Sequence, residues 1–137
     1  MSSITMHFEN NMATISAHPA GYAQLTYHAT KHTTEELRAV LGHTGDLLRH
    51  HRWHMLLEDH QQIGPLTNEQ QGMMLQYLQQ QTGSLDRPLC VATVLAQNVF
   101  VRLSVAALRH KLQTTDINYR SFSDTATASS WMLQIGR

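Results

Sequence analysis

The stretch that decides the fold is WHMLLEDHQQIGPLTNEQQGMMLQYL, residues 53–78. Its run Met55-Leu56-Leu57 is short and continuously apolar, which is typical of a strand covered on both faces. Thr67 and Gln70 have the spacing of a capping box and predict a helix that begins just after Thr67. Ligands and switches of open α/β sheets usually lie at the carboxyl ends of the strands. The loop between this strand and this helix is therefore where function is expected first.

Upstream of this stretch, the chain predicts an antiparallel meander followed by a helix. Apolar residues alternate with polar ones over 4–9, 13–17 and 23–27, with turn signals between them. The period then changes to that of a helix, and Thr33 with Glu36 forms a plausible capping box at its start. The predicted buried stripe of this helix consists of Leu37, Val40, Leu41, Thr44, Leu47 and Leu48.

Downstream, strands and helices continue to alternate. Residues 89–96, LCVATVLA, form the most strand-like run, and 117–122 form a last short strand. Asn98 and Asp124 can cap two further helices, the first with Val101, Val105, Leu108 and Leu112 on one face. The order β-β-β-α-β-α-β-α-β-α implies parallel pairing with right-handed crossovers in the later part. The sequence thus predicts one α/β domain over residues 1–137, with a mixed sheet in which an N-terminal antiparallel meander precedes βαβαβα units.

Composition narrows the classes of partner. The 137 residues carry ten basic and ten acidic side chains and ten histidines, with no basic run, so nothing indicates nucleic acid or an anionic membrane surface. One cysteine, Cys90, allows no internal disulfide, which fits a reducing compartment. The first residues lack the features of a signal peptide, and no window is long enough for a membrane span. We expect a cytoplasmic protein.

The element order and three segments resemble the STAS-like superfamily, which includes anti-sigma-factor antagonists and SEC14-like lipid-binding modules. The segments are WHMLLED before the loop, LCVATVLAQNVFVRLSVAAL as the next strand and helix, and NYRSFSDTATASSWM at the end. In anti-sigma antagonists the loop carries a serine that is phosphorylated at a helix N-terminus. This chain has no serine between Arg49 and Gly83. Asp59 and Thr67 are the candidates for a switch here, and a simple N-cap role is favoured for Thr67.

Other residues with reactive side chains are interpreted as structural. His50, His51 and His54 span a helix end, so their rings should diverge and no metal site is predicted. The group Glu58-Asp59-His60 at the strand end is expected to be a solvated terminus rather than an acid/base set. Cys90 is expected to be buried and inert. With no catalytic or nucleotide-binding motif, we expect neither an enzyme nor a cofactor.

The helix that follows Asn98 is apolar around much of its circumference, so part of it needs a second cover or forms an unusually wide core stripe. Our first hypothesis is a non-catalytic STAS-like regulatory module that acts by protein–protein contact, as a homodimer. The alternative is a small binding module for an apolar ligand or lipid, by analogy with SEC14-like relatives. The candidate interface or ligand-binding residues are Val99, Phe100, Leu103, Met73 and Met74, with Trp53 and Trp131 beside them.

Overall fold

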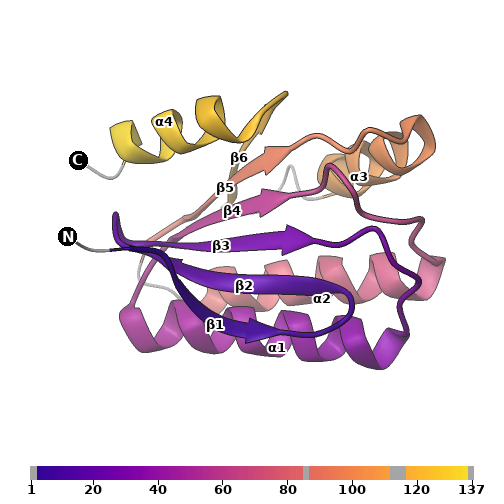
Figure 1. Cartoon of the computed structure of the whole chain (residues 1–137), viewed down its shortest axis with the longest axis horizontal. Helices are drawn as coiled ribbons and strands as arrows, with labels where there is room; N and C mark the ends of the chain where they lie inside the picture. The colour runs from indigo at the N-terminus through magenta and orange to yellow at the C-terminus, as the bar shows by residue number, and fades with distance from the viewer. Residues whose placement is uncertain (1–2, 85–86, 112–116, 136–137) are drawn as a thin grey trace.

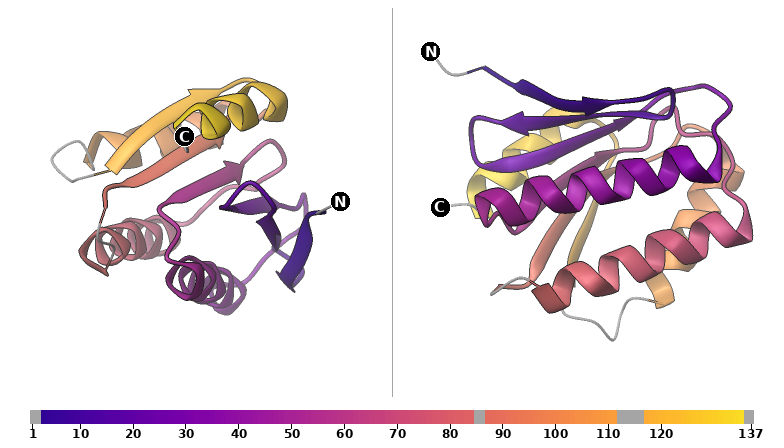
Figure 2. Two further views of the ribbon diagram at one scale, coloured as in Figure 1. Left: turned by 90° about the vertical axis from the view of Figure 1, so that its left-hand side faces the viewer. Right: turned by 90° about the horizontal axis from the view of Figure 1, so that it is seen from below.

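A mixed sheet with helices on both faces forms the centre of the protein (Figures 1 and 2). The computed structural model describes residues 3–84, 87–111 and 117–135. Within these residues the strands are β1 (Thr5–Glu9), β2 (Ala13–His18), β3 (Tyr22–Tyr27), β4 (Met55–Asp59), β5 (Leu89–Val94) and β6 (Ile117–Phe122). The helices are α1 (Thr34–His51), α2 (Asn68–Ser84), α3 (Val99–Lys111) and α4 (Thr125–Ile135).

The strands lie in the sheet in the order in which they occur in the chain, β1-β2-β3-β4-β5-β6. The first three pair antiparallel, and β3 to β6 pair parallel. One helix lies in each connection between parallel strands, as a crossover requires. The predicted α/β fold class, a meander followed by βαβαβα units, is therefore confirmed.

The helices divide unequally between the faces of the sheet. Figure 2 shows α4 on one side, with α1 and α2 side by side on the other. Buried residues of α3 join the same core as those of α1 and α2, so three helices share one face. The core under α4 is smaller and contains Tyr22, Met55, Leu57, Ala92, Val94, Ala128, Trp131 and Met132. This unequal cover places the larger of the two hydrophobic cores on the three-helix face.

Local signals in the sequence set the helix ends. Thr33 and Glu36 form the predicted capping box at the start of α1, and all six residues of the predicted α1 stripe are buried. The helix ends at Arg52, which adopts a left-handed conformation with φ of 55°. The Trp53 amide donates to the Leu48 carbonyl, as in a Schellman motif. Asn98 and Asp124 cap α3 and α4 as predicted.

Two further expectations concern α3 and the membrane. Val101, Val105 and Leu108 are buried on one face of α3, as predicted, whereas Leu112 lies outside the described residues. No helix in the described part of the chain is long and apolar enough to cross a membrane.

Candidate functional site

The loop between β4 and α2 uses its two switch candidates for local structure. The Thr67 hydroxyl accepts a hydrogen bond from the Gln70 amide, and the Gln70 side chain accepts one from the Thr67 amide. This is the predicted reciprocal capping box. The Asp59 carboxylate accepts from the Gln61 amide at 3.0 Å, which tightens the turn after β4. Both side chains therefore have defined structural bonds at the start of the loop and of the helix.

The prediction that the end of β4 is solvated is wrong for Glu58 and His60. Glu58 is 6% exposed and His60 is 2% exposed, and Glu58 Oε2 lies 2.7 Å from His60 Nε2. The physical reason is tertiary: Glu58 points to the three-helix face, and the loop folds His60 back so that its amide donates to the Val94 carbonyl of β5. The ring of Tyr27 meets the His60 ring edge-on at 5.3 Å between centroids. A buried acid–base pair thus lies where a solvated terminus was expected.

This pair belongs to a row of polar side chains that crosses the sheet. Glu58 is the register partner of Thr93 on β5, and Thr93 is the register partner of Ser121 on β6. Register partners in parallel strands project from the same face, so the three side chains form a line. The line runs from buried Glu58 through Thr93, which is 1% exposed, to exposed Ser121. Such a row in the interior of a sheet departs from the apolar pattern around it.

Three buried hydroxyls on this side of the sheet make no hydrogen bond within the described residues. They are Tyr27 OH on β3, Thr93 Oγ1 on β5 and Tyr77 OH on α2. Burial raises the pKa of the Tyr27 hydroxyl well above its ordinary value, and the nearby Glu58 carboxylate raises it further. A buried hydroxyl without a partner is unfavourable by about 1–3 kcal/mol. The polar cluster formed by this row together with Tyr27 and His60 therefore lowers the stability of the fold compared with an apolar core of the same shape.

A cavity of about 270 Å³ lies at the end of this row, beside α3. Its lining residues are His60, Thr93, Leu95, Ala96, Arg102, Val105, Ala106 and Ser121. Sequence reasoning did not identify this site. The available signal was Thr93, a hydroxyl inside the otherwise apolar run LCVATVLA, but its significance depends on the register with Glu58 and Ser121.

The outer face of α3 is apolar and exposed. Val99 is 58% exposed, Phe100 80% and Leu103 63%, and Ala106 and Ala107 are exposed on the same helix. Large apolar side chains grouped in this way on a surface commonly mark a contact site. The structure thus brings together three of the five residues predicted for an interface.

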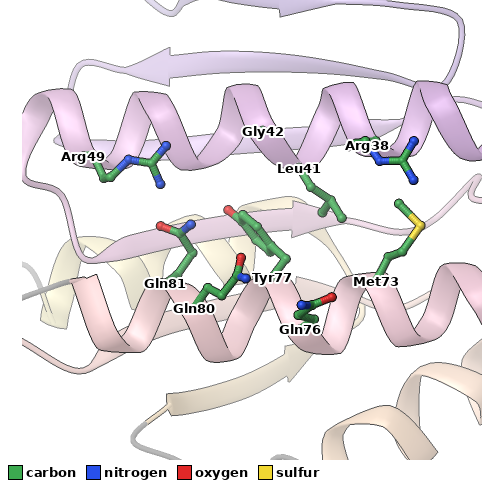
Figure 3. A pocket seen from close by; sticks show the side chains of 9 residues that line it. All are labelled: Arg38, Leu41, Gly42, Arg49, Met73, Gln76, Tyr77, Gln80 and Gln81. Carbon is green, nitrogen blue, oxygen red and sulfur yellow. The ribbon is translucent and has the colours of Figure 1, made fainter.

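The other two predicted interface residues lie elsewhere. Met73 lines a groove of about 400 Å³ between α1 and α2, where Figure 3 shows its side chain on the same side as Arg38 and Leu41. Met74 is buried in the core, because the α2 stripe turns it toward the sheet. Their expected place beside the exposed face of α3 is therefore wrong.

The two tryptophans also lie apart from the exposed face of α3. Trp53 stacks on His51 at 4.2 Å between centroids. Trp131 is a residue of α4, and its side chain is buried between that helix and the opposite face of the sheet, beside Phe122. Neither contributes to a surface shared with Phe100.

The histidine cluster and the cysteine have ordinary surroundings. The rings of His50 and His51 meet edge-on at 4.9 Å, and His51 stacks on Trp53. In the described ranges, no three His, Cys, Asp or Glu side chains are grouped to hold a metal ion. Cys90, which was expected to be buried, is only partly buried at the edge of the core under α4, and this partial burial raises the pKa of its thiol.

Comparison with models of known protein families, with curated proteins and with solved structures finds no match.

Proposed function

We propose that this protein is a non-catalytic, STAS-like regulatory module of the cytoplasm that acts through protein–protein contact, and that its first partner is a second copy of the same chain. The observation that carries the proposal is the exposed apolar face of α3, formed by Val99, Phe100 and Leu103. The STAS-like part rests on the resemblance of the sequence and on the order of its elements.

The chemistry of α3 favours a symmetric contact. Its sequence has no acidic residue, and three of its four basic residues, Arg109, His110 and Lys111, lie at its C-terminal end. Two copies that cross antiparallel near Leu103 would place these basic ends at opposite ends of the interface. The exposed apolar residues of each copy would then cover those of the other, which removes apolar surface from water. The formal net charge of zero means that two copies do not repel each other strongly at long range.

The experiment is light scattering coupled to size exclusion over a wide range of protein concentration. The original protein should show twice its chain mass of 15.5 kDa, and Phe100→Ser should show the chain mass alone. Leu133→Ser is the matched control, because Leu133 is also an exposed apolar residue but lies on α4. Circular dichroism checks that each variant is folded. A monomer at every concentration for the original protein, or equal dissociation of both variants, would overturn the proposal.

A further inference from the structure

The cavity at the carboxyl ends of β4, β5 and β6 combines apolar walls with a few polar groups. Leu95, Ala96, Val105 and Ala106 supply the apolar part. The polar groups are His60, Thr93, Ser121 and Arg102. Binding sites for small molecules commonly have this make-up, a mostly apolar lining with a small number of placed polar groups. The exposed side chains of Ser121 and Arg102 mark the side from which a solute can enter.

The Thr93 hydroxyl is the first independent sign of a ligand. Thr93 is 1% exposed, lines the cavity, and its Oγ1 has no hydrogen-bond partner within the described residues. A valine at position 93 has nearly the same shape and would make the folded protein more stable, because it has no buried polar atom that must lose its water. The hydroxyl can donate to or accept from a molecule held in the cavity.

Charge gives the class of that molecule. The cavity lining has two ionisable side chains, His60 and Arg102, and His60 is already paired with Glu58 at 2.7 Å. Arg102 is held at the cavity by its own bonds, since its Nε and Nη2 atoms donate to the Ala96 carbonyl at 3.0 and 2.8 Å. A positioned guanidinium is well suited to a carboxylate.

We propose that this cavity binds a small carboxylate with a short apolar chain. The carboxylate pairs with Arg102 and accepts a hydrogen bond from Thr93, while the chain lies against Leu95 and Val105. The volume of about 270 Å³ lies just below the range of about 300–1,000 Å³ that is typical of pockets for drug-sized ligands, which fits a small acid. The site borders the exposed face of α3 through Ala106, but Val99, Phe100 and Leu103 do not line it, so its assignment stands whether or not the protein dimerises.

The experiment is a titration of the full chain with sodium butyrate, followed by the backbone amide signals in NMR spectra at constant ionic strength. Butyramide is the neutral probe of the same shape. Butyrate should shift the amides of Thr93, Ala96 and Ser121 saturably, with a dissociation constant of about 1 mM for so small a ligand. Equal affinity for butyrate and butyramide would overturn the proposal. So would amide shifts that do not saturate, because they would mean that butyrate does not occupy the cavity.

Variants locate the binding. Arg102→Gln should weaken butyrate binding at least tenfold and leave butyramide unchanged, whereas Arg38→Gln, an exposed change on α1, should alter neither. Thr93→Val should also weaken butyrate binding, and because it is expected to stabilise the fold, its effect cannot be attributed to unfolding. Phe100→Ser should bind butyrate normally, which keeps the outcome independent of dimerisation. Unchanged butyrate binding in both Arg102→Gln and Thr93→Val would refute the site.

Discussion

Replacing Thr93 by valine should make the protein more stable. The substitution exchanges a hydroxyl for a methyl group of similar size in β5 and keeps the β-branched shape that strands favour. Thr93 is 1% exposed, and its hydroxyl makes no hydrogen bond within the described residues. Because an unsatisfied buried hydroxyl is unfavourable by about 1–3 kcal/mol, we expect the free energy of unfolding to rise by about 1–2 kcal/mol. For a domain of this size that corresponds to a rise in Tm of about 3–8 °C.

Thr44 in α1 provides the matched control. It is also fully buried, but its hydroxyl donates to the Val40 carbonyl at 2.8 Å. Thr44→Val loses this bond and should lower the free energy of unfolding by about 0.5–1.5 kcal/mol. Urea denaturation followed by circular dichroism measures both variants. If Thr93→Val is destabilised as much as Thr44→Val, the Thr93 hydroxyl is satisfied in solution and the reasoning fails.

Three further predictions test the packing and the charges. Gly42→Ala should stabilise α1 by about 0.5–1 kcal/mol, because the added Cβ meets nothing within 4 Å. Gly45→Ala should stabilise it less or destabilise it, because its Cβ would come within 2.9 Å of a side chain on α2. Thermal denaturation ranks the two variants, and equal gains in stability would contradict the expected close approach. His60→Leu leaves the buried Glu58 carboxylate without its partner and should lower the free energy of unfolding by about 3–5 kcal/mol. Adding Glu58→Leu should recover much of that loss in urea denaturation, and a double variant as unstable as the single one would count against the pair. Hydrogen bonds from the Thr127 amide and hydroxyl hold the pKa of Asp124 below its ordinary value of 3.8, so its contribution to stability is present above that pH and is lost as the pH falls below it. Asp124→Ala should therefore be less stable than the original protein at neutral pH, and a difference that persists unchanged in acid would contradict this account.

The parts of the fold that depend on short stretches of chain could be predicted from the sequence. The α1 stripe from Leu37 to Leu48 follows from helical spacing alone, and the capping boxes at Thr33 and Thr67 each involve residues three apart. The exposed apolar face of α3 was also foreseeable, because one helix carries more apolar residues than one core contact can cover.

The polar cluster could not be predicted in the same way. The polar sequence Glu58-Asp59-His60 at a strand end is typical of a solvated terminus. Glu58 and His60 are buried only because β4 pairs with β5 and the loop after β4 folds back onto β5. Met74 was misplaced for a similar reason, because its stripe shows that it is apolar but not which layer will cover it. Burial of a polar residue depends on partners far away in the chain, and no local pattern contains that information.

The sequential order of the strands has a consequence for how the protein is made. Each strand pairs with the one that precedes it in the chain, so the sheet can grow by addition at one edge as the polypeptide leaves the ribosome. No strand has to insert between two that are already paired, and each parallel step closes a loop of one helix and its connections. Each parallel step nevertheless pairs residues that lie about 30 positions apart, such as Ala23 with Leu56, so the parallel half of the sheet should form more slowly than the antiparallel meander. The Glu58–Thr93–Ser121 row is completed only when β6 arrives, so the carboxylate site proposed here would be among the last features to form during synthesis.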